Sequence, residues 1–236
     1  MRINKYLAEC GIASRRNCEK PILEGRVKIN GKVVTNLATE VSENDQVSLD
    51  DKKVTPIAKH IYLMMNKPKG FVTTTSDDKG RKTVMDLLSK KFANKRIFPV
   101  GRLDYDTEGL LLLTTDGDCA NRIAHPRNEI HKTYVANIEG EVPESELNKL
   151  REGVVLDGIK TAHSRIKVLG FDGKVTRVEV VISEGRNRQV RRMFESINRE
   201  VIFLKRTAIG ELKLGGMGRG EVRELKAEEV EYLKRM

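Results

Sequence analysis

The chain has 236 residues, a formal net charge of +10 at pH 7 and a sequence pI near 9.5. This length allows one large or two smaller domains with a real hydrophobic core, and the excess of Lys and Arg favours a polyanionic partner. No apolar run approaches the roughly 20 residues of a membrane span, and no signal-peptide pattern opens the chain. We therefore expect a cytoplasmic protein that binds nucleic acid, with an anionic membrane surface as the weaker alternative.

The spacing of cysteine and histidine residues predicts neither disulfides nor a metal site. The cysteines Cys10, Cys18 and Cys119 are odd in number and widely separated, which is typical of free thiols in a reducing compartment. The four histidines lack metal-ligand spacing, and no phosphate-cradling glycine loop is present. We expect no metal and no nucleotide cofactor.

The first 50 residues predict a small unit of two helices and a hairpin. Residues 2–10 place their apolar side chains on one helical face, and Ser14 is a good N-cap for a second helix over residues 15–25. Pro21 lies inside that second helix and should kink or shorten it. Asn30-Gly31, between alternating apolar residues, is a strong hairpin signal. Residues 51–59 are charged, carry a proline and predict a linker.

This arrangement resembles the alpha-L RNA-binding module of a small-subunit ribosomal protein and of several RNA-modifying enzymes. The segments that carry the likeness are Gly-Ile-Ala-Ser-Arg-Arg, ending at Arg16, and Val-Lys-Ile-Asn-Gly-Lys, which contains Lys28. The resemblance implies an RNA contact surface that includes Arg15, Arg16 and Lys28. The alternative is a solvated basic surface on a small domain.

Residues 60–236 predict a larger α+β domain on a mostly antiparallel, mixed β-sheet with flanking helices. Strands are expected at 61–65, 131–138, 164–169 and 175–183, a β-rich run at 71–75, and helices at 84–88, 118–124 and 144–151. The last two strands are joined through Asp172-Gly173, which is another hairpin signature.

Residues 101–117 form the first stretch whose side chains could take part in catalysis. Its polar first half holds three acids, and its second half, Leu110 to Leu113, is an unbroken aliphatic run typical of a buried strand. A carboxylate in a loop held against a rigid strand can act as a nucleophile or base. The plainer interpretation is that Asp104 and Asp106 are ordinary turn acids.

Residues 184–193 contain the second stretch, Glu-Gly-Arg-Asn-Arg-Gln-Val-Arg-Arg-Met. A helix over residues 187–197 would place Arg188, Arg191 and Arg192 on one face, beside a core stripe formed by Val190, Met193, Phe194 and Ile197. Guanidinium groups at this density favour an anionic partner, either phosphates or a buried carboxylate, over a solvated basic face.

Four segments together resemble the ribosomal pseudouridine synthases of the RsuA and RluB type. They are Asn-Lys-Pro-Lys-Gly at 66–70, Gly-Arg-Leu-Asp at 101–104, His-Lys-Thr-Tyr at 131–134, and the arginine-rich segment at 184–193. The resemblance covers the whole chain, with the alpha-L module in front. It implies that Asp104 is the catalytic aspartate, that Tyr134 stacks on the target base, and that Arg191 pairs with the catalytic aspartate.

The resemblance also implies site-specific isomerisation of uridine to pseudouridine in ribosomal RNA, with the large-subunit RNA favoured and the small-subunit RNA open. The expected partner is ribosomal RNA or a pre-ribosomal particle, bound by a monomer without cofactors, and a uridine must be turned out of the RNA before reaction. Further RNA-binding residues are expected at Lys67, Arg102, Asp106, Thr107, Arg186, Arg188 and Arg192.

Two rival interpretations come from other functional classes. A non-catalytic RNA-binding ribosome-assembly factor explains the charge and the N-terminal module, but gives no role to Asp104 with a tyrosine and an arginine cluster. A hydrolase acting on a glycosidic or phosphate bond would use a second carboxylate, for which Asp106 or Glu108 is available. Release of free uracil or of a shortened RNA would distinguish a hydrolase from an isomerase.

Overall fold

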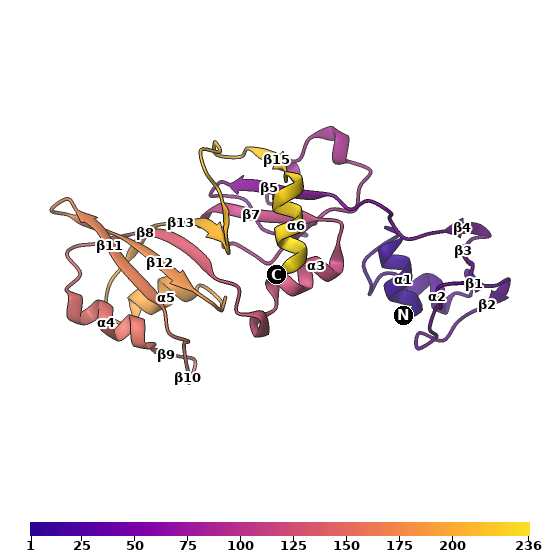
Figure 1. Ribbon diagram of the computed structural model, residues 1–236, viewed down its shortest axis with the longest axis horizontal. Helices are drawn as coiled ribbons and strands as arrows, with labels where there is room; N and C mark the ends of the chain where they lie inside the picture. Colours follow the sequence, from indigo (N-terminus) through magenta and orange to yellow (C-terminus); the bar gives the residue numbers. More distant parts are fainter. The chain divides into compact units, whose positions relative to one another are not determined.

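The computed structural model describes residues 1–236, and the chain divides into two compact units (Figure 1). The first unit comprises Met1–Ile61, Lys90–Ile97 and Thr114–Gly117, and the second comprises Tyr62–Ser89, Phe98–Leu113 and Asp118–Met236. No helix in either unit has the length and apolar character needed to cross a membrane.

Two short helices form one side of the first unit. Helix α1 (Ile3–Glu9) buries Ile3 and Leu7, as the apolar periodicity predicts. Helix α2 covers only Glu19–Leu23, so the expected helix over residues 15–25 is too long. Ser14 does accept a hydrogen bond, from the backbone N–H of Asn17 at 3.1 Å, but it caps a turn that precedes the helix. Pro21 therefore lies in the first turn of α2, where a helix does not need its backbone N–H.

The first unit also contains a four-stranded sheet in the order β2-β1-β3-β4. The predicted hairpin is confirmed, because β1 (Val27–Ile29) pairs with β2 (Lys32–Val33) around Asn30 and Gly31, which have φ angles of 51° and 80°. Strand β3 (Val47–Leu49) turns into β4 (Lys52–Val54). Strand β4 therefore occupies part of the linker expected over residues 51–59, and the boundary between the two domains stays a prediction.

A nine-stranded mixed sheet organises the second unit. Its main order is β11 (Arg165–Phe171), β12 (Val175–Ile182), β8 (Lys132–Glu139), β13 (Val201–Ile209), β7 (Glu108–Thr114), β5 (Tyr62–Lys67) and β15 (Val222–Glu224), with β14 (Leu212–Lys213) on β13 and β6 (Phe98–Val100) on β7. Strand β13 runs parallel to β7 and antiparallel to β8, and β12 is antiparallel to both β8 and β11. The expected α+β class is confirmed.

Most of the predicted elements of this unit are present, including α3 (Gly117–Ala124), α4 (Glu144–Glu152) and the β11–β12 hairpin. Helix α5 spans Gln189–Glu195, somewhat shorter than predicted, and a final helix, α6, spans Ala227–Arg235. The 3₁₀ turns of this unit are η1 (Val84–Leu87) and η3 (Pro126–Asn128), whereas η2 (Lys90–Phe92) belongs to the first unit. A separate hairpin joins β9 (Val155–Leu156) to β10 (Ile159–Lys160).

Two expectations for this unit are wrong or incomplete. Residues 71–75 do not form a strand, because only Val72 makes an isolated bridge, with Thr83. No element is predicted after residue 197, although β13 is a central strand of the sheet. The run Val201–Ile209 is rich in β-branched and aromatic residues, so its composition did carry a strand signal; its partners β8 and β7 could not be read locally.

Strand β7 fixes the position of the loop that precedes it. The side chains of Leu110 to Leu113 are at most 1% exposed, as predicted for a buried strand. At its start, Gly109 has a φ of 108°, and an added Cβ would lie 2.1 Å from the carbonyl oxygen of Arg206. Only glycine permits so close an approach, which brings β7 against β13 directly after the acidic loop.

Candidate active site

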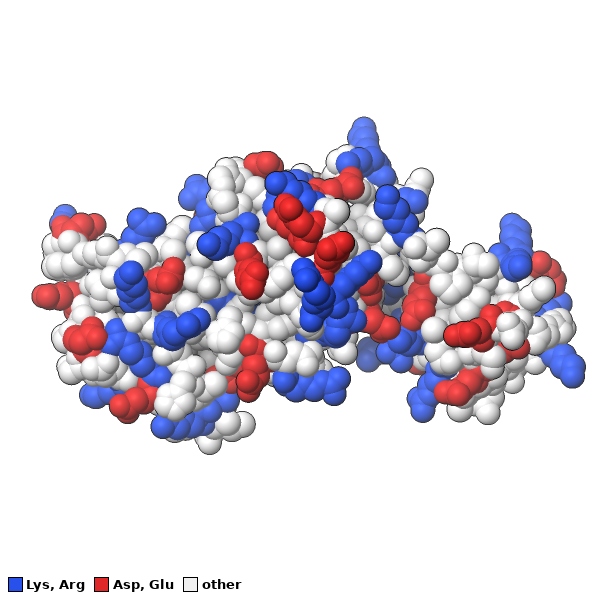
Figure 2. Space-filling view, viewed as in Figure 1, with Lys and Arg blue, Asp and Glu red and all other residues white.

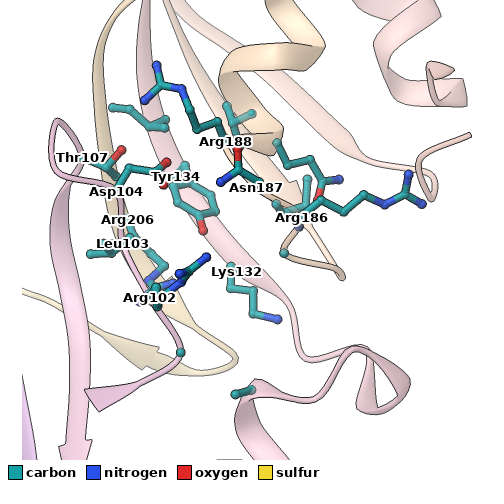
Figure 3. Close-up of a pocket in the computed structure, with 17 residues that line it drawn as sticks. Arg102, Leu103, Asp104, Thr107, Lys132, Tyr134, Arg186, Asn187, Arg188 and Arg206 are labelled. Carbon is teal, nitrogen blue, oxygen red and sulfur yellow. The ribbon is translucent and has the colours of Figure 1, made fainter. Parts of the chain in front are cut away.

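A pocket of about 250 Å³ lies where the loop before β7 meets β8, β13 and the segment leading into α5 (Figure 3). It brings together segments that are distant in sequence. The lining residues that matter for chemistry are Arg102, Asp104, Thr107, Lys132, Tyr134, Arg186, Asn187, Arg188 and Arg206.

Lys67 holds the Asp104 loop from inside the protein. Its Nζ donates hydrogen bonds to the carbonyl oxygens of Pro68 at 3.1 Å, Asp104 at 3.0 Å and Thr107 at 2.9 Å. The side chain is 0% exposed, so the expectation that Lys67 contacts RNA is wrong. A lysine ammonium has three N–H donors, and all three are used to fix the backbone on both sides of the acidic loop.

Burial lowers the pKa of Lys67 to about 8, from a usual value of 10.5. The nearby carboxylates of Asp104, Asp106 and Glu108 oppose that shift, while the guanidinium of Arg206 adds to it. Desolvation penalises the charged ammonium, and the acids of the loop recover part of the cost.

Asp104 and Tyr134 meet in the pocket, as expected for the two central residues. Figure 3 shows the Asp104 carboxylate beside the Tyr134 ring, and both residues line the cavity. Tyr134 is on β8 and is only 8% exposed. Asp104 is part of a loop whose backbone is fixed by Lys67 and by the Thr107 N–H, which donates to the Asp104 carbonyl at 3.1 Å. The pocket therefore offers a carboxylate next to an aromatic face.

Arg191 contacts Asp106 and not Asp104, so the expected pairing of Arg191 with Asp104 is not present in this structure. Its Nε lies 3.3 Å from Asp106 Oδ2, an ionic contact without hydrogen-bond geometry. Its Nη2 donates to the Asp106 carbonyl at 3.1 Å and its Nη1 to the Val201 carbonyl at 2.6 Å. The side chain of Asp106 also accepts from Arg188 at 3.1 Å. Asp106 thus joins the loop to α5, two residues beyond Asp104.

The other arginines of this segment are also paired with protein groups. Arg186 donates to Glu184 and to the carbonyl oxygens of Ile159 and Lys160, which ties the β9–β10 hairpin to the loop before α5. Arg192 forms a bidentate pair with Asp157 in the same hairpin. The arginines at 184–193 were expected to bind phosphates or carboxylates, and in this structure their anionic partners are carboxylates. Any role in RNA binding for Arg186, Arg188 and Arg192 stays a prediction.

Two cations of the pocket were not predicted as site residues. Lys132 lies in the same segment as Tyr134, and burial, together with the charge of Arg206, lowers its pKa. Arg206 is on β13, directly opposite Tyr134 in the strand register, and its Nε donates to the Leu110 carbonyl at 2.8 Å. Lys132 could have been found from its place in the His-Lys-Thr-Tyr motif. Arg206 could not, because the assignment of its strand was missing.

The remaining candidate residues differ in exposure. Arg102 lines the pocket and is exposed, whereas Thr107 is 2% exposed and can only act from inside the loop. In the first unit, Arg15 and Arg16 are exposed and make no salt bridge, while Lys28 pairs with Asp51 at 2.5 Å. On the face shown in Figure 2, Lys and Arg alternate with Asp and Glu and do not form one continuous patch. Net charge alone therefore does not mark a site on that face.

Comparison with known proteins identifies both parts of the chain. The model of the S4 domain matches residues 1–47, and the model of the RNA pseudouridylate synthase family matches residues 61–196. The chain belongs to the RNA pseudouridylate synthase family, with an S4 domain in front. The resemblance drawn from the sequence motifs is confirmed.

Individual relatives match over nearly their whole length. The chain is 48% identical over 235 residues to the ribosomal large subunit pseudouridine synthase B of Bacillus subtilis, covering 99% of this chain and 95% of that protein. It is 45% identical over 235 residues to an uncharacterized RNA pseudouridine synthase of Aquifex aeolicus, covering 99% and 93%. A crystal structure of a pseudouridylate synthase is similar at 34% identity and a TM-score of 0.71, covering 99% of both chains.

Proposed function

We propose that this protein converts uridine to pseudouridine at a specific position of large-subunit ribosomal RNA, with Asp104 as the catalytic carboxylate. The family and the 48% identity to a ribosomal large subunit pseudouridine synthase support the reaction and the RNA. The observation that carries the residue assignment is the pocket, in which the Asp104 carboxylate, on a loop fixed by Lys67, lies beside the Tyr134 ring on β8.

The reaction rearranges the substrate without adding or removing atoms. The N1–C1′ bond of uridine breaks, the uracil turns, and C5 bonds to C1′, after which the proton on C5 is lost and N1 gains one. Asp104 acts on the sugar or the base during this sequence, as a nucleophile or as a base. No redox step or energy source is required by this balance.

The pocket suits a base that has been turned out of an RNA helix. Extrusion of a nucleotide costs a few kcal/mol, and stacking on an aromatic ring together with contacts to flanking phosphates can offset that cost. Tyr134 provides the ring, and the exposed Arg102 at the pocket wall provides a cation for a phosphate. Arg191 acts through Asp106, by holding the loop that presents Asp104.

The activity and the substrate can be tested together in cells. Pseudouridines are mapped in both ribosomal RNAs by carbodiimide modification and primer extension, from cells with and without this gene. We expect one uridine of the large-subunit RNA to lose its mark and to regain it with the wild-type protein. An unchanged map would favour the non-catalytic assembly factor, and a changed site in the small-subunit RNA would overturn the choice of subunit.

The role of Asp104 is tested with the purified protein. We expect Asp104→Asn to lower the single-turnover rate by at least about a thousand-fold, as for loss of a group that acts on the reacting bonds, while RNA affinity stays within about two-fold. Asp78→Asn, at an exposed acid outside the pocket, is the control and should keep the wild-type rate. A rate of Asp104→Asn within ten-fold of wild type would contradict the assignment.

A further inference from the structure

The strands that carry the active site have a second face. Along a strand, successive side chains point to opposite sides of the sheet. Tyr134 on β8 and Arg206 on β13 line the pocket, so their neighbours Thr133 and Lys205 point away from it. Those neighbours are half-buried, as expected for a sheet face that is open to solvent.

A groove of about 810 Å³ runs over this second face. It crosses β11, β12, β8 and β13 and is bounded by the turn that carries β14. Its charged lining is strongly one-sided, with one acid, Glu179, and four basic residues, Arg165, Lys167, Lys205 and Lys213.

None of the four basic side chains of the groove makes a salt bridge or a hydrogen bond to another protein group. Lys167 lies opposite Glu179 in the register of β11 and β12, yet the two do not form an ion pair. The arginines of the segment 184–193 are different, because Arg186, Arg188 and Arg192 are each paired with a carboxylate. Unpaired like charges that line one groove repel each other, and a bound polyanion removes that repulsion.

We propose that this groove binds the sugar-phosphate backbone of an RNA segment other than the one that enters the active-site pocket. The two sites lie on opposite faces of the same strands, so one short stem-loop cannot be expected to fill both. The proposal takes from the proposed function only that RNA is the polyanion, and it adds a second anchoring surface. A long ribosomal RNA would then be held more tightly than the segment around the target uridine alone.

The test reverses charge in the groove and compares it with an equal change elsewhere. The variant Lys167→Glu/Lys213→Glu is matched by the control Lys149→Glu/Lys174→Glu, at exposed positions outside both the groove and the pocket. The probe is a full-length 23S ribosomal RNA transcript, with affinity measured over a series of salt concentrations. We expect the groove variant to bind about ten-fold more weakly than the control and its salt slope to fall by about two, since each phosphate contact contributes about one.

A second variant and a rate measurement distinguish a loss of RNA contacts from a folding defect. The neutral variant Lys167→Gln/Lys213→Gln avoids placing two acids opposite each other on β11 and β12, and should weaken binding in the same direction by a smaller factor. The single-turnover rate at saturating RNA should equal that of the control, because neither residue lies in the pocket. If both groove variants bind like the control, the proposal is overturned.

A photo-crosslinking residue identifies what occupies the groove. With p-benzoylphenylalanine in place of Lys213, we expect crosslinks to RNA outside the segment that contains the target uridine. Crosslinks only to a ribosomal protein in pre-ribosomal particles would overturn the choice of RNA. If the wild-type protein forms no pseudouridine but the groove variants still lose affinity, the proposed function fails and the groove proposal stands. If the wild-type protein forms pseudouridine but the groove variants bind like the control, the groove proposal fails and the proposed function stands.

Discussion

Cations lie near both faces of the β8–β13 region, but the protein uses them differently on the two sides. Around the acidic loop, Lys67, Arg188 and Arg191 are bonded to its carbonyl oxygens or carboxylates, and of these three Arg188 lines the pocket. On the groove face, Lys167 and Lys213 have no protein partner. Positive charge on the first face builds the geometry of the loop, while on the second it is available to a ligand.

The comparison shows why a count of basic residues is a poor guide to an RNA site. The densest arginine segment of the sequence, residues 184–193, is largely neutralised within the fold. A cation that is paired with a carboxylate and partly buried offers little to a phosphate, since both charges would have to be separated first. Changes to the paired cations around the acidic loop should therefore alter rate, and changes to the unpaired cations of the groove should alter affinity.

Among the changes that test this division between rate and affinity, Lys67→Met is expected to lower the single-turnover rate the most. Three carbonyl oxygens of the loop region would lose their donor, and a small displacement of a reacting group can cost about a hundred-fold in rate. We expect a single-turnover rate about a hundred-fold lower, with RNA affinity within about two-fold of wild type. Lys69→Met, at the exposed neighbouring lysine, is the control. Lost affinity with an unchanged rate would break the division.

A smaller effect is expected for Arg191→Lys, which keeps the charge but removes the planar guanidinium. A lysine cannot reach Asp106 Oδ2, the Asp106 carbonyl and the Val201 carbonyl at once. We expect a rate about ten-fold lower, measured in single turnover at saturating RNA. Arg192→Lys alters the adjacent residue, which pairs outside the pocket with Asp157, and should change the rate less than three-fold on the same scale. Equal losses in both variants would show that only helix α5 as a whole matters.

The smallest effect concerns the pH dependence of stability. The pKa of Lys67 is lowered to about 8 by burial, so the folded protein releases this proton more readily than the unfolded chain, in which the value is 10.5. Between these values the unfolded state binds more protons, and the contribution of Lys67 to the free energy of unfolding rises with pH. Urea unfolding at pH 7.5 and 10 should show wild type gaining stability relative to Lys67→Met. Parallel behaviour of the two proteins would contradict the lowered pKa.

The sequence by itself determined the local features of this protein. Apolar periodicity located α1 and α4, the Asn30-Gly31 and Asp172-Gly173 pairs located two hairpins, and the Leu110–Leu113 run located the buried strand. These signals depend on neighbouring residues alone. The motifs around Asp104 and Tyr134 also sufficed to predict that the two residues belong to one site.

Only the tertiary structure decided which partner each charged residue has. Lys67 stands in a motif that resembles a basic turn, and only the burial of β5 shows that it holds the Asp104 loop. Arg191 binds Asp106 because α5 approaches the loop two residues beyond Asp104. Arg206 reaches the pocket because β13 pairs with both β8 and β7, which places it opposite Tyr134 and beside Gly109, and a single sequence does not show these pairings. Contacts of this kind join segments up to about a hundred residues apart, and a single sequence does not encode their geometry locally.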